Sequence, residues 1–301
     1  MTKINVCPAI LRKLRENSGF SVEELARKLD VSVEKIIKVE EGRDSLTLTQ
    51  IKKLADIYKI PLAAFFSKDI PDIPSLPDYR LNRERRLSPE VFVAIRRAKY
   101  LSEEIIHLSG KRSKIPDFPD TQPETLAKNL REYLKLKIPV FGNPNEALEF
   151  YKNILENELN IMVLELPLKS EDVRAFSLNL ELSVIVLNES DEPQVKLFSL
   201  FHELAHLLKH GGGICSIDIS EDQFEVEKFC NKFAAEFLVP SEDLITKLKN
   251  RTLSDREISE LAEQYGVSVQ VMMLRLLDSG LIARERYFEF KNKFDESKLR
   301  K

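Results

Sequence analysis

The spacing of hydrophobic residues in the N-terminal part of the chain predicts a series of short amphipathic helices. Apolar side chains recur every three or four residues in "PAILRKLRENSG", "SVEELARKLD", "SVEKIIKVEEG" and "TLTQIKKLADIYKIP". Ser21, with Glu24 three residues later, is a capping box, and Ser32 is the expected cap of the next helix. Two short helices joined by a tight turn and braced by neighbours form a helix-turn-helix. Residues 1–69 are therefore predicted to be an all-α domain.

The pattern changes in the next 50 residues. The segment "DIPDIPSLPDYR" contains three prolines, a density that disfavours a helix and suits an extended linker. A helical pattern follows from about Pro89 to Leu108, and basic residues are concentrated before it and in its first half. Residues 70–119 are predicted to be a proline-rich linker and a basic helix.

Helical and strand patterns are mixed from residue 120 onward. Helical "ETLAKNLREYLKL" and "NPNEALEFYKNILENELN" precede the strand-like segments "IMVLEL", "VRAFSL" and "LSVIVLN". Two apolar helices follow, and the last 60 residues are again helical. The predicted fold class is α+β and mostly helical, with a small mixed sheet within residues 120–245 and a helical C-terminal subdomain over residues 246–301. We expect "LSVIVLN" to be an edge strand of that sheet.

Composition and charge exclude several classes of protein. Hydrophobic residues make up 43% of the chain and charged residues 32%, which is typical of globular domains. No apolar run reaches the roughly 20 residues of a membrane span, the N-terminus lacks a signal-peptide pattern, and three cysteines do not suit a disulfide framework. We therefore expect a cytoplasmic protein without a membrane partner. Residues 1–70 carry 13 Lys and Arg against 10 Asp and Glu, although the whole chain has a net charge of −3. This basic N-terminal part is a hint of a nucleic-acid partner.

Three of the four histidines lie on one apolar helix, at positions 202, 206 and 210. Residues 202–206 read HExxH, and on a helix residues four apart lie about 6 Å from each other. The imidazoles of His202 and His206 can therefore converge on one metal ion, while Glu203 can take a proton from a water bound there. Burying several unpaired imidazoles would be costly. The pattern favours a metal site over histidines that occur by chance on a core helix.

A catalytic zinc site usually has three protein ligands and one open position, and the third ligand has two candidates here. His210 continues the stripe, but on a straight helix it lies about 12 Å from His202. A third-histidine motif also needs a glycine turn before that residue, whereas these glycines follow it. His210 is then a helix-end residue on the substrate side. The favoured candidate is Glu227 on the next helix, with Asn231 one turn later to accept a hydrogen bond from a ligating imidazole.

The segment "RAFSLNLELSVIVLNESDEPQVKLFSLFHELAHLLKH", followed by "EKFCNKFAAEFLVP", closely resembles the ImmA/IrrE metallopeptidases. The resemblance covers roughly residues 170–240 and implies a gluzincin-like peptidase of the zincin fold. It implies His202, His206 and Glu227 as metal ligands and Glu203 as the general base.

Two neighbouring positions bear on that resemblance. Asn231 occupies the family's usual Asn or Asp position, whereas Cys230 stands where alanine is common, and a buried cysteine would pack similarly. Glu225 and Glu236 lie on other faces of the same predicted helix, which disfavours them as ligands.

The implied metal is Zn²⁺, although a site with two histidines and one carboxylate also accepts Mn²⁺ or Fe²⁺.

The N-terminal segments, from "LRKLRENSGFSVEELARKLDVSVEKIIKVEEG" to "TLTQIKKLADIYKIPLAAFF", resemble an XRE/Cro-type helix-turn-helix. The resemblance implies double-stranded DNA as a partner, contacted by Ser32, Lys35, Lys38 and Arg43. Base recognition prefers Arg, Asn and Gln, however, and Glu34 would repel phosphates. A module for dimerisation or for docking another helix-turn-helix protein is the alternative, and a homodimer is the candidate assembly.

Together the two resemblances imply a zinc-dependent endopeptidase with a DNA-binding or partner-docking module. Its expected substrate is a repressor- or antitoxin-like protein, cleaved to control gene expression in a mobile-element or stress response. A segment of that substrate would pair as an extra strand with "LSVIVLN", the expected edge strand that precedes the HExxH helix. The alternative is a metal-sensing XRE-type transcriptional regulator without proteolytic activity. Glu203 favours the enzyme, because a purely structural metal site would not need it.

Overall fold

The computed structural model describes residues 3–4, 6–16, 18–58, 60–66, 88–119, 122–169, 173–209, 221–248 and 251–299. The predicted proline-rich linker and His210 lie outside the described residues. Across the described ranges, no helix combines the length and the apolar character that a membrane span requires.

The N-terminal part forms the predicted bundle of short helices. Its elements are β1 (Lys3–Ile4), α1 (Pro8–Glu16), α2 (Val22–Leu29), α3 (Val33–Glu40), β2 (Leu46–Thr47), α4 (Leu48–Tyr58) and the 3-10 helix η1 (Leu62–Phe66). The capping box is present: the Oγ of Ser21 accepts a hydrogen bond from the N–H of Glu24, whose carboxylate accepts one from the N–H of Ser21. All four α-helices pack on one apolar cluster, in which Ile51 and Phe65 are fully buried.

A three-stranded mixed sheet follows, built from β3 (Met162–Leu166), β4 (Ala175–Leu178) and β5 (Val184–Asn188). The strand order is β3-β5-β4, with β3 parallel and β4 antiparallel to β5. The prediction that "LSVIVLN" lies at the sheet edge is therefore wrong, because β5 pairs on both sides. All five residues of β5 are buried, and the first four are apolar, which is typical of a strand in the centre of a covered sheet.

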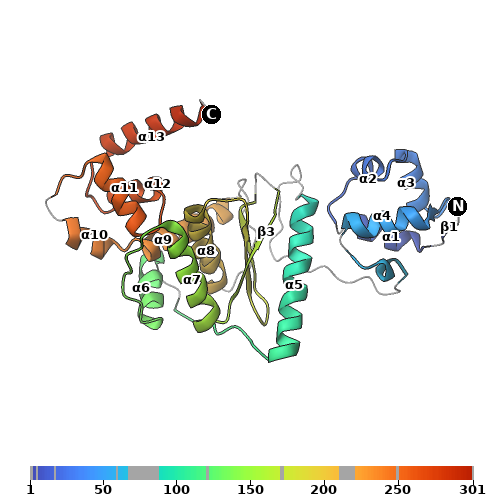
Figure 1. Ribbon diagram of the computed structural model, residues 1–301, viewed down its shortest axis with the longest axis horizontal. Helices are drawn as coiled ribbons and strands as arrows, with labels where there is room; N and C mark the ends of the chain where they lie inside the picture. The colour runs from blue at the N-terminus through green and yellow to red at the C-terminus, as the bar shows by residue number, and fades with distance from the viewer. Residues whose placement is uncertain are drawn as a thin grey trace.

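Helices cover both faces of this sheet. Ile185 and Leu187 of β5 pack with α7 (Pro144–Glu158) and α8 (Pro193–Leu208), whereas Val184 and Val186 pack with α5 (Pro89–Ser109). As Figure 1 shows, α5 stands on one side of the sheet and α7 and α8 stand on the other. The helix that we predicted next to a linker is thus a structural layer of the sheet.

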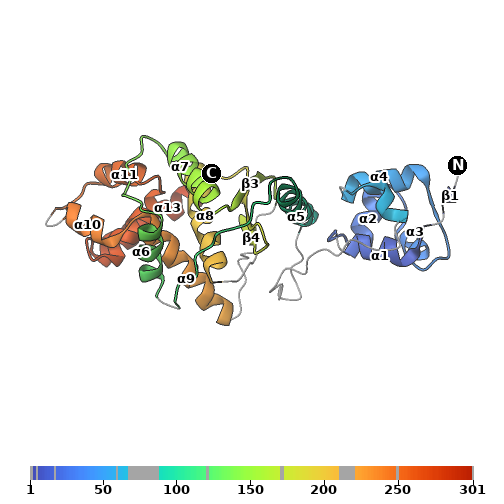
Figure 2. The same cartoon turned by 90° about the horizontal axis from the view of Figure 1, so that it is seen from below.

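Arg96 of α5 also contacts the helix-turn-helix domain. Its guanidinium donates hydrogen bonds to the Oγ of Ser18, at 3.2 Å, and to the carbonyl oxygen of Tyr58. Burial disfavours the charged form and lowers the pKa of Arg96 to about 10. Figures 1 and 2 both place α5 between the sheet and this domain. At least one charge of the predicted basic helix therefore joins two parts of the protein.

The C-terminal helices share a core with α8, which carries the HExxH residues. The remaining elements are α6 (Pro123–Tyr133), α9 (Glu221–Leu238), α10 (Ser241–Leu248), α11 (Asp255–Gln264), α12 (Val269–Asp278) and α13 (Arg284–Leu299). Ile258 of α11 and Met272 of α12 belong to the same apolar cluster as Leu204 of α8, so this core continues past residue 245. The predicted mostly helical α+β class with a small mixed sheet is confirmed.

Gly266, in the turn between α11 and α12, packs tightly against α7. Its φ is +71°, and an added Cβ would lie 2.3 Å from the Cβ of Ala147. We expect Gly266→Ala to lower the free energy of unfolding by about 2–5 kcal/mol, from backbone strain and overpacking together. Urea-induced unfolding measures this change.

Gly280 provides the matched control for that substitution. Its φ is +68°, but an added Cβ would meet nothing within 4 Å. Gly280→Ala should therefore cost only the backbone term, about 1–2 kcal/mol. Equal losses in the two variants would show that the contact with Ala147 does not matter.

Candidate metal centre

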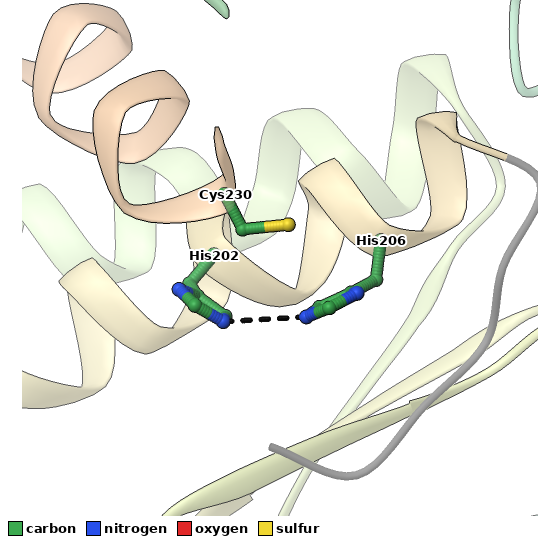
Figure 3. A group of neighbouring side chains, drawn as sticks. All are labelled: His202, His206 and Cys230. Carbon is green, nitrogen blue, oxygen red and sulfur yellow. Dashed lines mark hydrogen bonds between the residues drawn. The ribbon is translucent and has the colours of Figure 1, made fainter. Parts of the chain in front are cut away.

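The HExxH residues lie on the buried part of α8. His202 and His206 are 7% and 8% exposed, and their Nε2 atoms lie 3.3 Å apart. The two rings point toward each other along one face of the helix, as Figure 3 shows. This convergence follows from the four-residue spacing, because side chains at i and i+4 lie over one another on a helix.

Glu227 reaches the same point from α9, which packs against α8. One carboxylate oxygen lies 3.0 Å from the Nε2 of His202 and the other lies 3.4 Å from the Nε2 of His206. Burial disfavours the carboxylate, but the two histidines outweigh that effect and lower the pKa of Glu227 to about 2. The structure thus brings together the three residues that we predicted as ligands, while their role as ligands stays a prediction.

Asn231 lies one helical turn after Glu227 and holds the outer side of a histidine ring. Its Oδ1 is 3.0 Å from the Nδ1 of His202. An amide oxygen accepts a hydrogen bond from an Nδ1–H, and the tautomer protonated there has its Nε2 free to bind a metal ion. Asn231 therefore lies where the sequence predicts an acceptor for a ligating imidazole, while its orienting role stays a prediction.

We expect Asn231→Ala to weaken metal binding by about 10–100-fold, because the ring of His202 loses its orientation. Asn231→Asp keeps an acceptor oxygen and should lose much less affinity. Lys232→Ala, at an exposed position on the same helix, is the control. Competitive titration against a chelator measures the affinities. An Asn231→Ala protein with wild-type affinity would contradict the orienting role.

Glu203 is buried beside this cluster at 1% exposure, and its Oε2 makes no hydrogen bond to the described residues. A buried carboxylate oxygen without a partner is costly unless a ligand or a reacting group satisfies it. Two imidazole nitrogens and a carboxylate separated by 3.0–3.4 Å form the donor set of a catalytic zinc site. The residues present therefore fit a divalent metal ion and a water molecule next to it.

Cys230 is the residue at this site whose place sequence reasoning missed. We interpreted it as a packing residue, yet its sulfur and ligand nitrogens of both histidines lie within 4.8 Å of one another. Burial opposes the imidazolium of His206, but hydrogen bonds to Cys230 and Glu227 and the charge of Glu203 raise the pKa of His206 to about 11. The available signal was helical spacing, since Cys230 follows Glu227 by three residues.

Two parts of the chain match known families. Residues 156–277 match the IrrE N-terminal-like domain of a peptidase family, and residues 11–65 match the helix-turn-helix family. Residues 156–277 are therefore similar to an IrrE N-terminal-like domain. Both resemblances stated from the sequence are confirmed, and the match extends past the metal helix through α9 to α12. No curated protein sequence matches the chain.

Glu225 and Glu236, the two carboxylates of α9 that the sequence disfavours as ligands, make contacts elsewhere. Glu236 accepts hydrogen bonds from Arg275 of α12 and from the Oγ of Ser241. Glu225 is exposed and pairs with Lys228. These contacts of Glu225 and Glu236 are with residues other than His202 and His206. His210, the other candidate, lies outside the described residues.

The predicted DNA contacts lie on and after α3 of the helix-turn-helix domain. Ser32 caps α3 by accepting a hydrogen bond from the N–H of Lys35. Each of the three cations has an acidic neighbour: Lys35 pairs with Asp44, Lys38 pairs with Glu34, and Arg43 pairs with Glu41. This surface is therefore close to electrically balanced, and phosphate contacts would compete with these acids.

Proposed function

We propose that the chain is a metal-dependent endopeptidase that cleaves a protein substrate. One observation carries the proposal: His202, His206 and Glu227 converge within 3.4 Å beside the buried Glu203, whose Oε2 has no hydrogen-bond partner among the described residues. The match of this region to a peptidase family supports it. His202, His206 and Glu227 would hold a divalent metal ion, which would supply Lewis acidity for the scissile carbonyl and for a water molecule near neutral pH.

The residues of the chain supply the proton transfers and the orientation. Glu203 accepts the proton of the attacking water and then donates it to the leaving amine nitrogen. Glu227 provides negative charge between two imidazoles, and Asn231 keeps the Nε2 of His202 directed inward. The apolar neighbours on α8 exclude bulk water, which strengthens each of these electrostatic interactions.

The corrected strand order supports a proposal for where the substrate binds. With β5 in the centre, β4 is the sheet edge that packs against α8. The N–H of Asn188 donates to the carbonyl of Arg174, so the alternation of an antiparallel ladder directs the backbone groups of Ala175 and Ser177 away from β5. We place the substrate segment along this edge, where it would add as a further strand.

A pocket of about 870 Å³ borders the outer side of the site. Glu227 and Asn231 form part of its wall, together with apolar side chains that include Phe198, Phe224 and Leu274. Phe224 and Leu274 are 57% and 41% exposed, so they could contact an apolar side chain of a bound protein.

Zinc is our proposed metal, and the proposed compartment is the cytoplasm.

Cleavage of a repressor- or antitoxin-like protein is the specific form of this proposal. The test is to incubate the metal-loaded protein with proteins of that kind encoded beside its gene, and to identify fragments by mass spectrometry. Cleavage at one or a few bonds supports a selective peptidase. Efficient degradation of unrelated unfolded proteins would contradict it. Metal binding without cleavage of any such protein would favour a metal-sensing regulator.

The helix-turn-helix domain supports a second function, the binding of double-stranded DNA. The observation that favours it is the match over residues 11–65 together with cations on and after the capped α3. Because those cations are paired with acidic side chains, we propose weak, salt-sensitive binding that positions the peptidase near its substrate. Dimerisation or docking of another helix-turn-helix protein is the alternative role.

Glu34 and Lys38 give a direct test of the DNA role. Glu34→Gln removes the carboxylate 2.7 Å from Lys38, and we expect tighter DNA binding because the cation is released for a phosphate. Lys38→Gln should weaken binding and reduce the slope of log affinity against log salt concentration by about 0.9. Fluorescence anisotropy with a duplex from the region upstream of the gene measures both. Unchanged affinity in both variants would favour the docking role.

A further inference from the structure

His202, His206 and Cys230 form a fully internal cluster of metal-binding side chains. The potential ligand atoms of these three residues lie within 4.8 Å of one another, and the thiol of Cys230 is 0% exposed. In Figure 3 the sulfur lies over the space between the two imidazole rings. This group shares both histidines with the set that contains Glu227.

The hydrolytic mechanism gives no role to a thiol at this position. Cys230 lies in the apolar core, yet its sulfur also lies within 4.8 Å of the ligand nitrogens of His202 and His206, and its thiol interacts with His206 and with the charges of Glu227 and Glu203. Thiolate sulfur is a strong zinc ligand, and four-coordinate tetrahedral geometry is usual for zinc. Two imidazoles, a carboxylate and a thiolate make a complete tetrahedral set.

We propose that Cys230 is a fourth ligand that closes the metal site in a resting state of the protein. The inference rests on the proposed metal site and extends it. With the thiolate bound, no coordination position is left for water beside Glu203, so hydrolysis requires Cys230 to leave the metal. A sulfur ligand also selects zinc over manganese, which prefers oxygen ligands.

The decisive experiment detects sulfur coordination rather than activity. The full-length chain and Cys230→Ala are loaded with one equivalent of cobalt(II), and their near-ultraviolet spectra are compared. Wild type should show a thiolate-to-cobalt charge-transfer band, which Cys230→Ala should lose while it still binds cobalt. X-ray absorption of the zinc form should show one sulfur at about 2.3 Å, in addition to nitrogen and oxygen ligands.

The other cysteines provide the control. A variant with Cys7→Ser and Cys215→Ser should keep the band, because Cys230 remains. Circular dichroism checks the fold of Cys230→Ala, and Cys230→Ser gives a second variant of nearly native size. Per bound zinc, Cys230→Ala should turn over substrate faster than wild type.

Each outcome decides a specific part of the proposal. A cobalt-loaded wild type without the charge-transfer band overturns sulfur ligation, and so does a band that persists in Cys230→Ala. Equal turnover per zinc in wild type and Cys230→Ala overturns the resting state. Wild type that takes up neither cobalt nor zinc overturns the metal site itself, and therefore the proposed function as well.

Discussion

Replacing Glu203 by glutamine should abolish hydrolysis while the protein keeps its fold and its metal. The substitution preserves the size of a side chain that is 1% exposed, but an amide cannot accept the proton of the attacking water. Loss of a general base costs on the order of 10²–10⁴ in rate, and cleavage by the variant should fall by about that factor. Quantifying the fragments of the substrate protein over time measures the effect.

Glu225→Gln is the control for this prediction. It makes the same chemical change on an exposed residue and should leave both cleavage and metal content unchanged. If Glu203→Gln cleaved the substrate at the wild-type rate, Glu203 would not be the general base. If Glu203→Gln lost its metal as well, the carboxylate would be part of the metal site rather than the base.

Glu227→Ala should lose the metal. The carboxylate lies 3.0 Å and 3.4 Å from the two imidazole nitrogens, and it supplies negative charge that a divalent ion needs. Loss of an outer hydrogen-bond partner such as Asn231 weakens metal binding by about 10–100-fold. We expect Glu227→Ala to lose more affinity than that. Metal analysis after dialysis against a chelator measures the amount retained, with Glu225→Ala as the control on the same helix.

The same experiment separates the two candidates for the third ligand. His210→Ala should keep its metal if Glu227 is the ligand. Full metal content in Glu227→Ala, together with loss of metal from His210→Ala, would assign the position to the histidine instead.

Local signals accounted for the elements that the sequence predicted well. The capping box at Ser21 and Glu24 depends on residues three positions apart, and the helix follows directly from it. The convergence of His202 and His206 depends only on helical spacing. The contact between Asn231 and His202 needed one further inference, that the next helix packs beside the first.

Non-local packing explains what the sequence did not predict. An apolar run such as "LSVIVLN" shows that a strand is buried but not which strands flank it, so β5 was assigned to the edge rather than the centre. The basic residue Arg96 gave no sign that it would contact Tyr58 on another domain. Cys230 was predicted to be a packing residue, because alanine is common at its position in the family that the sequence resembles. Its proximity to both histidines depends on how α8 and α9 pack against each other.

In the proposed function, His202, His206 and Glu227 hold a metal ion for catalysis. The most direct measurement is the metal content per chain of the purified wild type, Glu203→Gln and His202→Ala by inductively coupled plasma mass spectrometry. We predict close to one equivalent of zinc in wild type and in Glu203→Gln, and almost none in His202→Ala. Absence of metal from wild type after incubation with zinc, or equal zinc in His202→Ala, would contradict the account.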